Sequence, residues 1–447
     1  MASIRTIVAH IILEYLRFFT KIQIWKIHPF IIGVGGSSGK SSLTELVGIV
    51  LQERYIVNTT KEKNSETGIP LHILGIHMAE FSYKAWIFAI LLTPFRIMIN
   101  WRKYDILVAE MGIDSPVEPK NMSYLLKIIR PTMGVITNIS LEHTVYFDPF
   151  IKAGTEKERK EQLLAYTAKE ELLLLQSLPE NGNAILNIDD PMILNAVSTV
   201  SASKTSISLY DKSATLFASH IMIDISQFAM EFVYKNKEYI LKLQHSLPQH
   251  FAYEFLFAIA IGVLKGISIE QSISSIEKHF SLPPGRMTIF EGIRDTTLID
   301  SSYNNATLSP MLDMLDFLSK LGRHRRKVVI VGDMRELGSQ SKENHEIVAE
   351  KIVREADIAI LIGPLLQNYA SPILRSKKFP FQSFSTFSAA KQYILECIKK
   401  DDIILIKSSQ NTLFLERVVE MLLENKNDVA KLCRRGEFWD KKRMQTA

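Results

Sequence analysis

Three stretches of the chain share one pattern: a short, uninterrupted apolar run that ends in small or polar residues. They are residues 31–42 (IIGVGGSSGKSS), 106–112 (ILVAEMG) and 133–138 (MGVITN). A run that is apolar at every position is typical of a strand in a parallel sheet, because helices cover such a sheet on both faces. Residues 43–51 follow the first run with helical spacing. The pattern therefore predicts strand, tight loop and helix in an α/β fold.

The same alternation returns in the second half of the chain. Apolar runs stand at residues 297–300, 327–332, 358–363 and 403–407, with helical patterns between them. Short alternating stretches between residues 201 and 244 predict antiparallel strands, and residues 251–264 predict an apolar core helix. The sequence LPPGRM at residues 282–287 has the composition of a linker. We predict a short helical segment (1–29), a central domain with a mostly parallel sheet (30–284) and a smaller Rossmann-like α/β domain (285–447).

The loop after the first apolar run has the composition of a phosphate-binding loop. It consists of Gly36, Ser37, Ser38, Gly39, Lys40 and Ser41. Glycines let consecutive backbone N–H groups face one point, and the helix that follows adds the positive end of its dipole. Lys40 would reach the terminal phosphates and the Ser41 hydroxyl would hold Mg²⁺. The loop departs from the strict motif, because Val34 stands at its first glycine position. An ordinary turn between strand and helix is the alternative.

Polar side chains at the ends of the other two apolar runs are expected near this loop. Parallel strands end at a common edge of the sheet, where ligands bind. Glu110 lies near the end of the second run, Asn138 ends the third, and His143 follows it. A carboxylate such as Glu110 is a suitable ligand for Mg²⁺, which prefers hard oxygen atoms. A solvated strand end, and a structural histidine, are the alternatives for Glu110 and His143.

Composition and charge place limits on the partners of the chain. The 447 residues are 47% hydrophobic and 23% charged, which is a globular composition large enough for two or three domains. The net charge of +5 is spread along the chain, so no basic stripe for nucleic acid is expected. The two cysteines, Cys397 and Cys433, have no metal-ligand spacing, and a reducing cytoplasm fits them.

The first 29 residues mix basic and apolar side chains. Residues 6–13 are too short and interrupted for a spanning helix, and residues 85–95 have about half the length that a span needs. Packing of residues 1–29 against the protein is one interpretation. Peripheral contact with the inner face of a membrane is the other.

Taken in order, these pieces resemble the Mur ligase family, the ATP-dependent amide-forming enzymes of peptidoglycan synthesis. The resemblance covers roughly residues 30 to 440, and its most specific parts are GDMRELG at 332–338 and IDSSYN at 299–304. It implies a monomeric cytoplasmic ligase that uses ATP and Mg²⁺. The branch with the 332–338 stretch joins D-alanyl-D-alanine to a muramoyl tripeptide through an acyl phosphate. A relative with another carboxylate and amine, or a non-catalytic nucleotide-binding relative, remain alternatives.

The resemblance also implies roles for individual residues. Lys40, His143 and Lys169 would be catalytic, and Ser41, Glu110, His143 and Lys169 would hold Mg²⁺. Lys169 would carry a carbamate, although Lys157 is a rival for that role. The phosphate loop would bind ATP together with Asn187, Arg286 and Asp300. The substrates would contact Asn64, Asp333, Glu336, His345 and Lys407.

Some positions depart from the family pattern. Gly35 replaces a usual threonine, and Phe251 and Glu254 stand where asparagines hold the nucleotide base and ribose. About 30 residues precede the first strand, where the family has a separate UDP-gripping domain. We therefore expect the acceptor to be held mainly by its peptide, or by residues 1–29 together with the segment 86–101.

Overall fold

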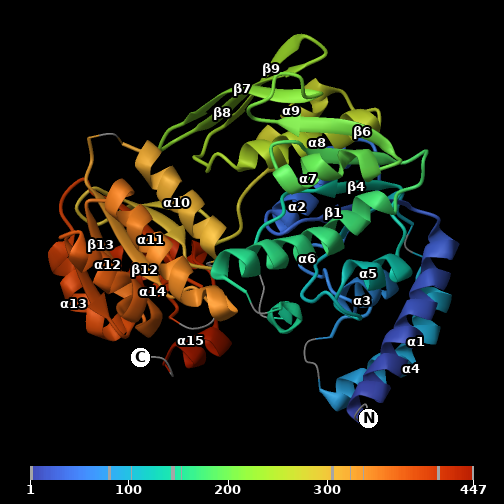
Figure 1. Cartoon of the computed structure of the whole chain (residues 1–447), viewed down its shortest axis with the longest axis horizontal. Coiled ribbons are helices and arrows are strands. Elements are labelled where there is room, and N and C mark those ends of the chain that lie inside the picture. The colour runs from blue at the N-terminus through green and yellow to red at the C-terminus, as the bar shows by residue number, and fades with distance from the viewer. Residues whose placement is uncertain are drawn as a thin grey trace. The chain divides into compact units, whose positions relative to one another are not determined.

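The structure is a computed structural model of the chain (Figure 1). It describes residues 4–78, 82–101, 103–141, 146–152, 154–303, 307–322, 324–335, 337–409 and 413–444. The chain divides into two compact units. The first comprises Met1–His220, Met230–Leu241 and Ala252–Phe280, and the second comprises Ile221–Ala229, Lys242–Phe251 and Ser281–Ala447. The strands form two sheets, and the α/β fold that the apolar runs predict is confirmed.

The larger sheet has the strand order β2-β3-β1-β4-β5-β6-β7-β8-β9. Its strands are β1 (Phe30–Gly35), β2 (Val57–Thr59), β3 (Ile106–Glu110), β4 (Met133–Ile136), β5 (Asn183–Asn187), β6 (Ser203–Ser208), β7 (Leu216–Ile223), β8 (Phe228–Tyr234) and β9 (Lys237–Leu243). Every pair from β2 to β7 is parallel. The central position of β1 between β3 and β4 brings the ends of all three predicted strands to one edge.

The expectation of antiparallel strands throughout residues 201–244 is wrong for the first two of them. β6 is parallel to β5, and β7 is parallel to β6. β7 begins where β6 ends, so that only Ile207 with Leu216 and Ser208 with Phe217 are paired, and a short loop suffices for this stagger. β8 and β9 are joined by Lys235 and Asn236, which both have positive φ. That turn geometry connects antiparallel neighbours.

Helices pack on the larger sheet and on one another. They are α1 (Ile4–Ile27), α2 (Lys40–Leu51), α3 (Gly68–Leu74), α4 (Tyr83–Ile99), α5 (Met122–Ile128), α6 (Glu156–Gln176), α7 (Pro191–Ala196), α8 (Phe251–Leu264) and α9 (Ile269–His279). α6 packs closely on β1 and β4, because both strands carry glycines beneath it. A Cβ atom at Gly33 would lie 2.7 Å from Leu174, and one at Gly134 would lie 3.3 Å from Leu175.

The smaller sheet has the order β10-β11-β15-β12-β13-β14, with only β10 antiparallel to its neighbour. Its strands are β10 (Thr288–Gly292), β11 (Thr296–Ser301), β12 (Lys327–Gly332), β13 (Ile358–Ile362), β14 (Phe381–Phe384) and β15 (Ile403–Lys407). The helices are α10 (Leu308–Lys320), α11 (Ser341–Glu355), α12 (Ser371–Ser376), α13 (Phe387–Cys397), α14 (Glu416–Leu422) and α15 (Glu437–Met444).

Alternate residues of the smaller sheet enter two separate cores. Val329 and Val331 of β12 pack with α10 and α11, whereas Val328 and Ile330 pack with α13 and α14. This explains the uninterrupted apolar runs, since both faces of the sheet are covered. Within the described ranges, no helix combines the length and apolar content that crossing a bilayer requires.

Candidate functional site

The phosphate loop connects β1 to α2 and is held in a left-handed backbone conformation. Gly36 has φ +117° and Gly39 has φ +79°. A Cβ atom at Gly36 would lie 2.1 Å from the hydroxyl of Thr137. Only glycine fits at this position, because both the backbone angle and the contact exclude a side chain. The loop therefore has the compact form that its composition predicts.

The N–H groups in the first part of the loop are bound by other parts of the protein. Gly36 N–H donates to Oε2 of Glu171 at 2.8 Å, Ser37 N–H to the carbonyl of Asn138 at 2.9 Å, and Ser38 N–H to Oδ1 of Asn138 at 3.0 Å. The first intrahelical bond of α2 runs from Leu43 N–H to Gly39. The amides before Leu43 have no partner within the helix, so the N-terminus of α2 is the place where an anion would bind.

Lys40 is the first residue of α2, and its side chain folds back over the loop. Its Nζ donates to the carbonyls of Gly36 at 2.5 Å and Ser37 at 3.0 Å. The ammonium group therefore lies above the loop beside the N-terminus of α2. This is the position from which a lysine can reach a phosphate bound at that terminus.

Ser41, Glu110 and Asn64 form the polar group at the edge of the sheet. The Ser41 hydroxyl donates to Oε1 of Glu110 at 2.8 Å, and the Asn64 amide donates to the same oxygen at 3.1 Å. Oε2 of Glu110 accepts from Glu62 N–H at 2.9 Å. Glu110 is the last residue of β3, beside β1 in the sheet, which is why its carboxylate meets the loop.

This donor set fits Mg²⁺. A hydroxyl and a carboxylate in contact beside an anion site supply two hard oxygen ligands, and phosphate oxygens and water complete the shell that Mg²⁺ prefers. Among the described side chains, no cluster of three or more histidine, cysteine, aspartate or glutamate residues forms a metal cage. Phosphate oxygens of a bound nucleotide would complete the coordination of an ion held by Ser41 and Glu110.

A second carboxylate, Glu171 of α6, is buried beside the loop. Burial raises its pKa to about 7, although the Lys40 ammonium and the Gly36 N–H act in the opposite direction. A Cβ atom at Gly35 would lie 3.1 Å from Oε2 of Glu171. Gly35, which departs from the family pattern, thus leaves the space that Glu171 occupies. The sequence did not identify Glu171 as a site residue, because nothing distinguishes it from the other glutamates of a helix rich in leucine and glutamate.

Glu254 of α8 is a third carboxyl group at the loop. It is buried, and burial raises its pKa well above the ordinary value. Its Oε1 would lie 3.0 Å from a Cβ atom at Gly39. Phe251, at the start of the same helix, is also buried. A neutral Glu254 can accept and donate a hydrogen bond at the N-terminus of α2, whereas an ionised one would repel a phosphate there.

Asn187, at the end of β5, stabilises the phosphate loop through a contact with Thr137. Its amide donates to the carbonyl of Thr137 at 3.0 Å, and the Thr137 hydroxyl donates to the carbonyl of Ser38 at 2.6 Å. Asn138 adds a bond from Nδ2 to the Ser38 hydroxyl at 2.8 Å. Asn187 is therefore positioned to fix the loop, and its side chain acts through Thr137.

The lysines considered as carbamate carriers are both exposed on α6. The Lys157 Nζ lies 3.9 Å from Oε1 of Glu161, and Lys169 is exposed while its neighbours Glu170 and Glu171 are buried. The role of Lys169 stays a prediction. His143 and Glu336 lie outside the described residues.

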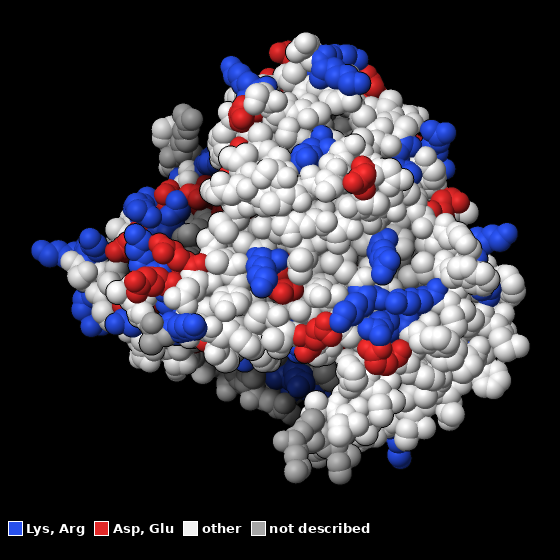
Figure 2. Space-filling model, turned by 45° about the vertical axis from the view of Figure 1, so that its right-hand side comes forward, with Lys and Arg blue, Asp and Glu red and all other residues white. Residues whose placement is uncertain are grey.

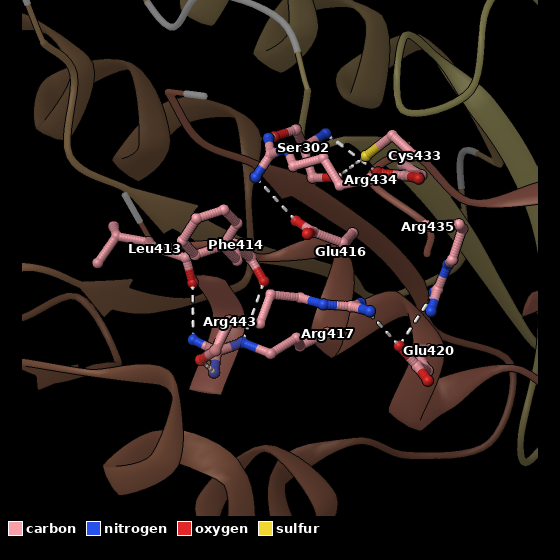
Figure 3. A network of polar contacts seen from close by, with 11 residues as sticks. Ser302, Leu413, Phe414, Glu416, Arg417, Glu420, Cys433, Arg434, Arg435 and Arg443 are labelled. Carbon is pink, nitrogen blue, oxygen red and sulfur yellow. Dashed lines mark hydrogen bonds and ion pairs between the residues drawn. The ribbon is translucent and has the colours of Figure 1, made fainter. Parts of the chain in front are cut away.

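In the second unit, Asp300 lies buried near the end of β11, and its neighbour Ser302 belongs to a network of polar contacts with Arg434 and Glu416 (Figure 3). Oδ1 of Asp300 accepts from Ser302 N–H at 3.0 Å. Arg434 donates to the Ser302 carbonyl at 2.9 Å and pairs with Glu416 at 3.1 Å, with both side chains fully buried. Burial raises the pKa of Asp300, against the lowering effect of Ser302 and Arg434.

Asp333 and His345 both contact backbone groups of the second unit. The two oxygens of Asp333 accept from Leu365 N–H at 3.1 Å and Leu366 N–H at 2.9 Å. His345 is buried; its Nε2 accepts from Met334 N–H at 3.1 Å, and its Nδ1 lies 2.6 Å from the Ser341 carbonyl. Burial lowers the pKa of His345. These contacts fix the loop after β12.

The last two predicted residues of this unit lie at its linker and at β15. The guanidinium of Arg286 lies 5.8 Å from the ring centre of Tyr303, which follows the end of β11. Lys407 is the last residue of β15 and is fully buried. Its backbone pairs with Ser301 on one side and Val331 on the other.

Two domain families match the chain in sequence. The Mur ligase middle domain matches residues 34–262, which is more than half of the chain, and the Mur ligase glutamate ligase domain matches residues 285–410. The similarity that the sequence motifs predict is thereby confirmed.

Curated relatives are named UDP-N-acetylmuramoyl-tripeptide--D-alanyl-D-alanine ligase. The Escherichia coli (strain K12) protein is 24% identical over 401 residues, with 88% of this chain and 77% of the relative covered. The Synechocystis protein is 26% identical over 404 residues, with 89% and 76% covered. The Bacillus subtilis protein is 24% identical over 420 residues, with 92% and 80% covered.

Solved structures of MurF ligases share the fold of this chain. MurF from Acinetobacter baumannii gives a TM-score of 0.73 at 18% identity, covering 93% of this chain and 80% of that one. MurF ligase from Thermotoga maritima, in complex with ADP, gives 0.72 at 21% identity, covering 92% and 83%.

Proposed function

The chain belongs to the Mur ligase family, and we propose that it is an ATP-dependent ligase that joins D-alanyl-D-alanine to a muramoyl tripeptide in peptidoglycan synthesis. The observation that carries the proposal is the contact between Ser41 and Glu110 at 2.8 Å, beside Lys40 on the phosphate loop. The names of the curated relatives support the choice of substrates.

The nucleotide would bind with its terminal phosphates at the N-terminus of α2. There the helix dipole, the first-turn amides without an acceptor inside the helix, and the Lys40 ammonium all favour negative charge. Ser41 and Glu110 would hold Mg²⁺, which supplies charge neutralisation for the transferred phosphoryl group. Asn64 orients the Glu110 carboxylate through its bond to Oε1. We expect Asn187 and Asn138 to keep the loop in this form.

The reaction would proceed in two steps. A carboxylate oxygen of the tripeptide attacks the γ-phosphorus, the bond to the β-phosphate oxygen breaks, and ADP leaves. The amine of D-alanyl-D-alanine then attacks the acyl carbon, inorganic phosphate leaves with the bonding electron pair, and the nitrogen loses a proton. Neither step needs covalent attachment to the protein, so positioning and electrostatic stabilisation supply the catalysis.

The second unit would contribute Arg286 and Asp300 to the nucleotide and Asp333, His345 and Lys407 to the substrates. His143, Glu336 and a carbamate on Lys169 complete the proposed set. Burial of Asp300 and its network with Ser302 and Arg434 favour a single fixed geometry at the end of β11. The protein would act as a cytoplasmic monomer, at the inner face of a membrane that residues 1–29 contact.

An ADP-release assay tests the proposal. We expect ADP only when ATP, Mg²⁺, an acceptor tripeptide and D-alanyl-D-alanine are all present, with a product of the summed mass minus one water in the mass spectrum. Nucleotide-linked and nucleotide-free tripeptides, compared side by side, would show whether UDP is required. ADP release that does not depend on the dipeptide would contradict the proposal. Nucleotide binding without any turnover would favour a non-catalytic relative.

A further inference from the structure

The outward faces of α1 and α4 are apolar, which is the reverse of an ordinary surface helix. On α4, Phe88, Leu91, Phe95 and Met98 follow one another at spacings of three and four residues, and each is 65 to 71% exposed. These spacings place them on one face of the helix. Ala89 and Thr93 of the opposite face are the buried ones.

α1 repeats the same arrangement. Ile7, Ile11, Phe18 and Trp25 stand at spacings of four and seven residues, and each is 51 to 73% exposed. Leu13 and Leu16, between them, are buried. Figure 2 shows a broad, largely uncharged surface on this part of the molecule.

The two helices pack against each other through their inner faces, so the outward apolar residues are not the ones that form this contact. The Tyr15 hydroxyl donates to the Ile90 carbonyl at 2.9 Å, and the Lys26 Nζ donates to the Ile97 carbonyl at 2.6 Å. Leu16 of α1 and Ala89 of α4 share a core with residues of α3. Figure 1 shows α1 and α4 side by side. Their inner faces are thus already used.

The charges on these helices are almost all positive. The sequence of α1 contains Arg5, Arg17, Lys21 and Lys26 but only one acid, Glu14, which pairs with Arg17. The sequence of α4 contains Lys84 and Arg96 and no acid. A second copy of the same surface would bring like charges together, whereas an anionic surface would be complementary.

Aromatic side chains lie where the two helices end. Trp25 is 73% exposed, and Trp101, just after α4, is 69% exposed. The Lys26 Nζ lies 3.7 Å from the ring centre of Trp101. Tryptophan beside a cationic side chain is typical of the headgroup layer of a bilayer, where the ring is half buried and the charge stays wet.

We propose that α1 and α4 together form a monotopic docking surface for an anionic phospholipid bilayer. The apolar rows would enter the boundary of the acyl chains, and the basic residues with Trp25 and Trp101 would lie among the headgroups. This inference rests on the proposed membrane contact of residues 1–29 and extends it to α4. It does not rest on the ligase activity.

Sedimentation of the full chain with lipid vesicles tests the proposal. We expect binding to phosphatidylcholine vesicles that contain about 30% phosphatidylglycerol, weaker binding to pure phosphatidylcholine, and loss of binding at high salt. The double variant Phe88→Gln/Phe95→Gln should lower the affinity about tenfold or more. Lys21→Gln/Lys84→Gln should lower it only for the anionic vesicles. Phe438→Gln is the control, because this exposed phenylalanine lies in the second unit.

Two results would overturn the proposal. One is equal binding of the wild type and the Phe88→Gln/Phe95→Gln variant to anionic vesicles. The other is a dimer in sedimentation equilibrium that this double variant disrupts while vesicles bind neither protein, which would assign the surface to a second copy. Vesicle sedimentation needs neither ATP nor an acceptor, so its result stands whether or not the chain releases ADP, and the two proposals are tested separately.

Discussion

Replacing Glu171 with glutamine removes an ionisable group that is buried beside the phosphate loop. The amide oxygen of the glutamine can still accept from Gly36 N–H, so the local hydrogen bond is kept. The variant therefore isolates the effect of the charge. Glu161→Gln on the same helix is the matched control, since its side chain is 65% exposed.

The expected magnitude follows from the pKa of Glu171, which burial raises from an ordinary 4.5 to about 7. Below pH 4.5 the group is protonated in both the folded and the unfolded state, and stability does not depend on it. Between pH 4.5 and 7 the unfolded state loses the proton first, so the stability of the wild type falls as pH rises. Above pH 7 the free energy of unfolding of the wild type has fallen by the full amount, about 3 kcal/mol, since each unit of pKa shift corresponds to about 1.4 kcal/mol.

Urea unfolding at pH 4.5, 6 and 8 would measure this difference. Tryptophan fluorescence would report the unfolding, because Trp25, Trp86 and Trp101 lie in the unit that contains Glu171. A Trp439→Phe background removes the fluorescence of the fourth tryptophan, which lies in the other unit. We expect the free energy of unfolding of Glu171→Gln to exceed that of the wild type by about 3 kcal/mol more at pH 8 than at pH 4.5. Glu161→Gln should show no such trend. A stability difference that is constant across this pH range would refute the reasoning.

The other predictions concern the metal site, the loop and the arginine network. Glu110→Gln removes the carboxylate charge at the proposed metal site, so ADP release should fall about a hundredfold and need more Mg²⁺; an unchanged Mg²⁺ titration would contradict that role. Gly36→Ala should cost about 3 kcal/mol of stability, because φ is +117° and Thr137 blocks a Cβ atom; an unchanged melting temperature would argue against this loop conformation. Arg434→Met leaves the buried Glu416 unpaired and should cost about 3–5 kcal/mol in urea unfolding of the second unit, with much of the loss recovered in Arg434→Met/Glu416→Leu. Similar losses in the single and double variants would indicate that Arg434 acts through packing.

The sequence was informative wherever one physical pattern decides the structure. Apolar runs on both faces predicted the parallel strands, and their common edge predicted that Ser41 and Glu110 meet. Glu171 was missed because its burial depends on Gly35, which lies in another element 136 residues away and whose role appears only when α6 packs on β1.

Two other features were hidden for similar reasons. The parallel pairing of β6 and β7 follows from their stagger, which alternation along a strand does not encode. The apolar outer face of α4 could not be told from a buried face by periodicity, because the same spacing describes both. The resemblance implied only a substrate contact for Asn64, and its bond to Glu110 appears in the structure.

The bond from Arg434 to the Ser302 carbonyl joins residues 132 positions apart. During translation, the end of β11 emerges from the ribosome long before the arginine that secures it. Until residue 434 has been made and has folded back, the backbone around Asp300 lacks this tether. A chain cut by a protease before that point would keep every proposed nucleotide ligand and still lose the bond to Ser302, whose N–H donates to Asp300. Loss of the C-terminal residues would thus affect the proposed nucleotide site through β11, which is synthesised much earlier.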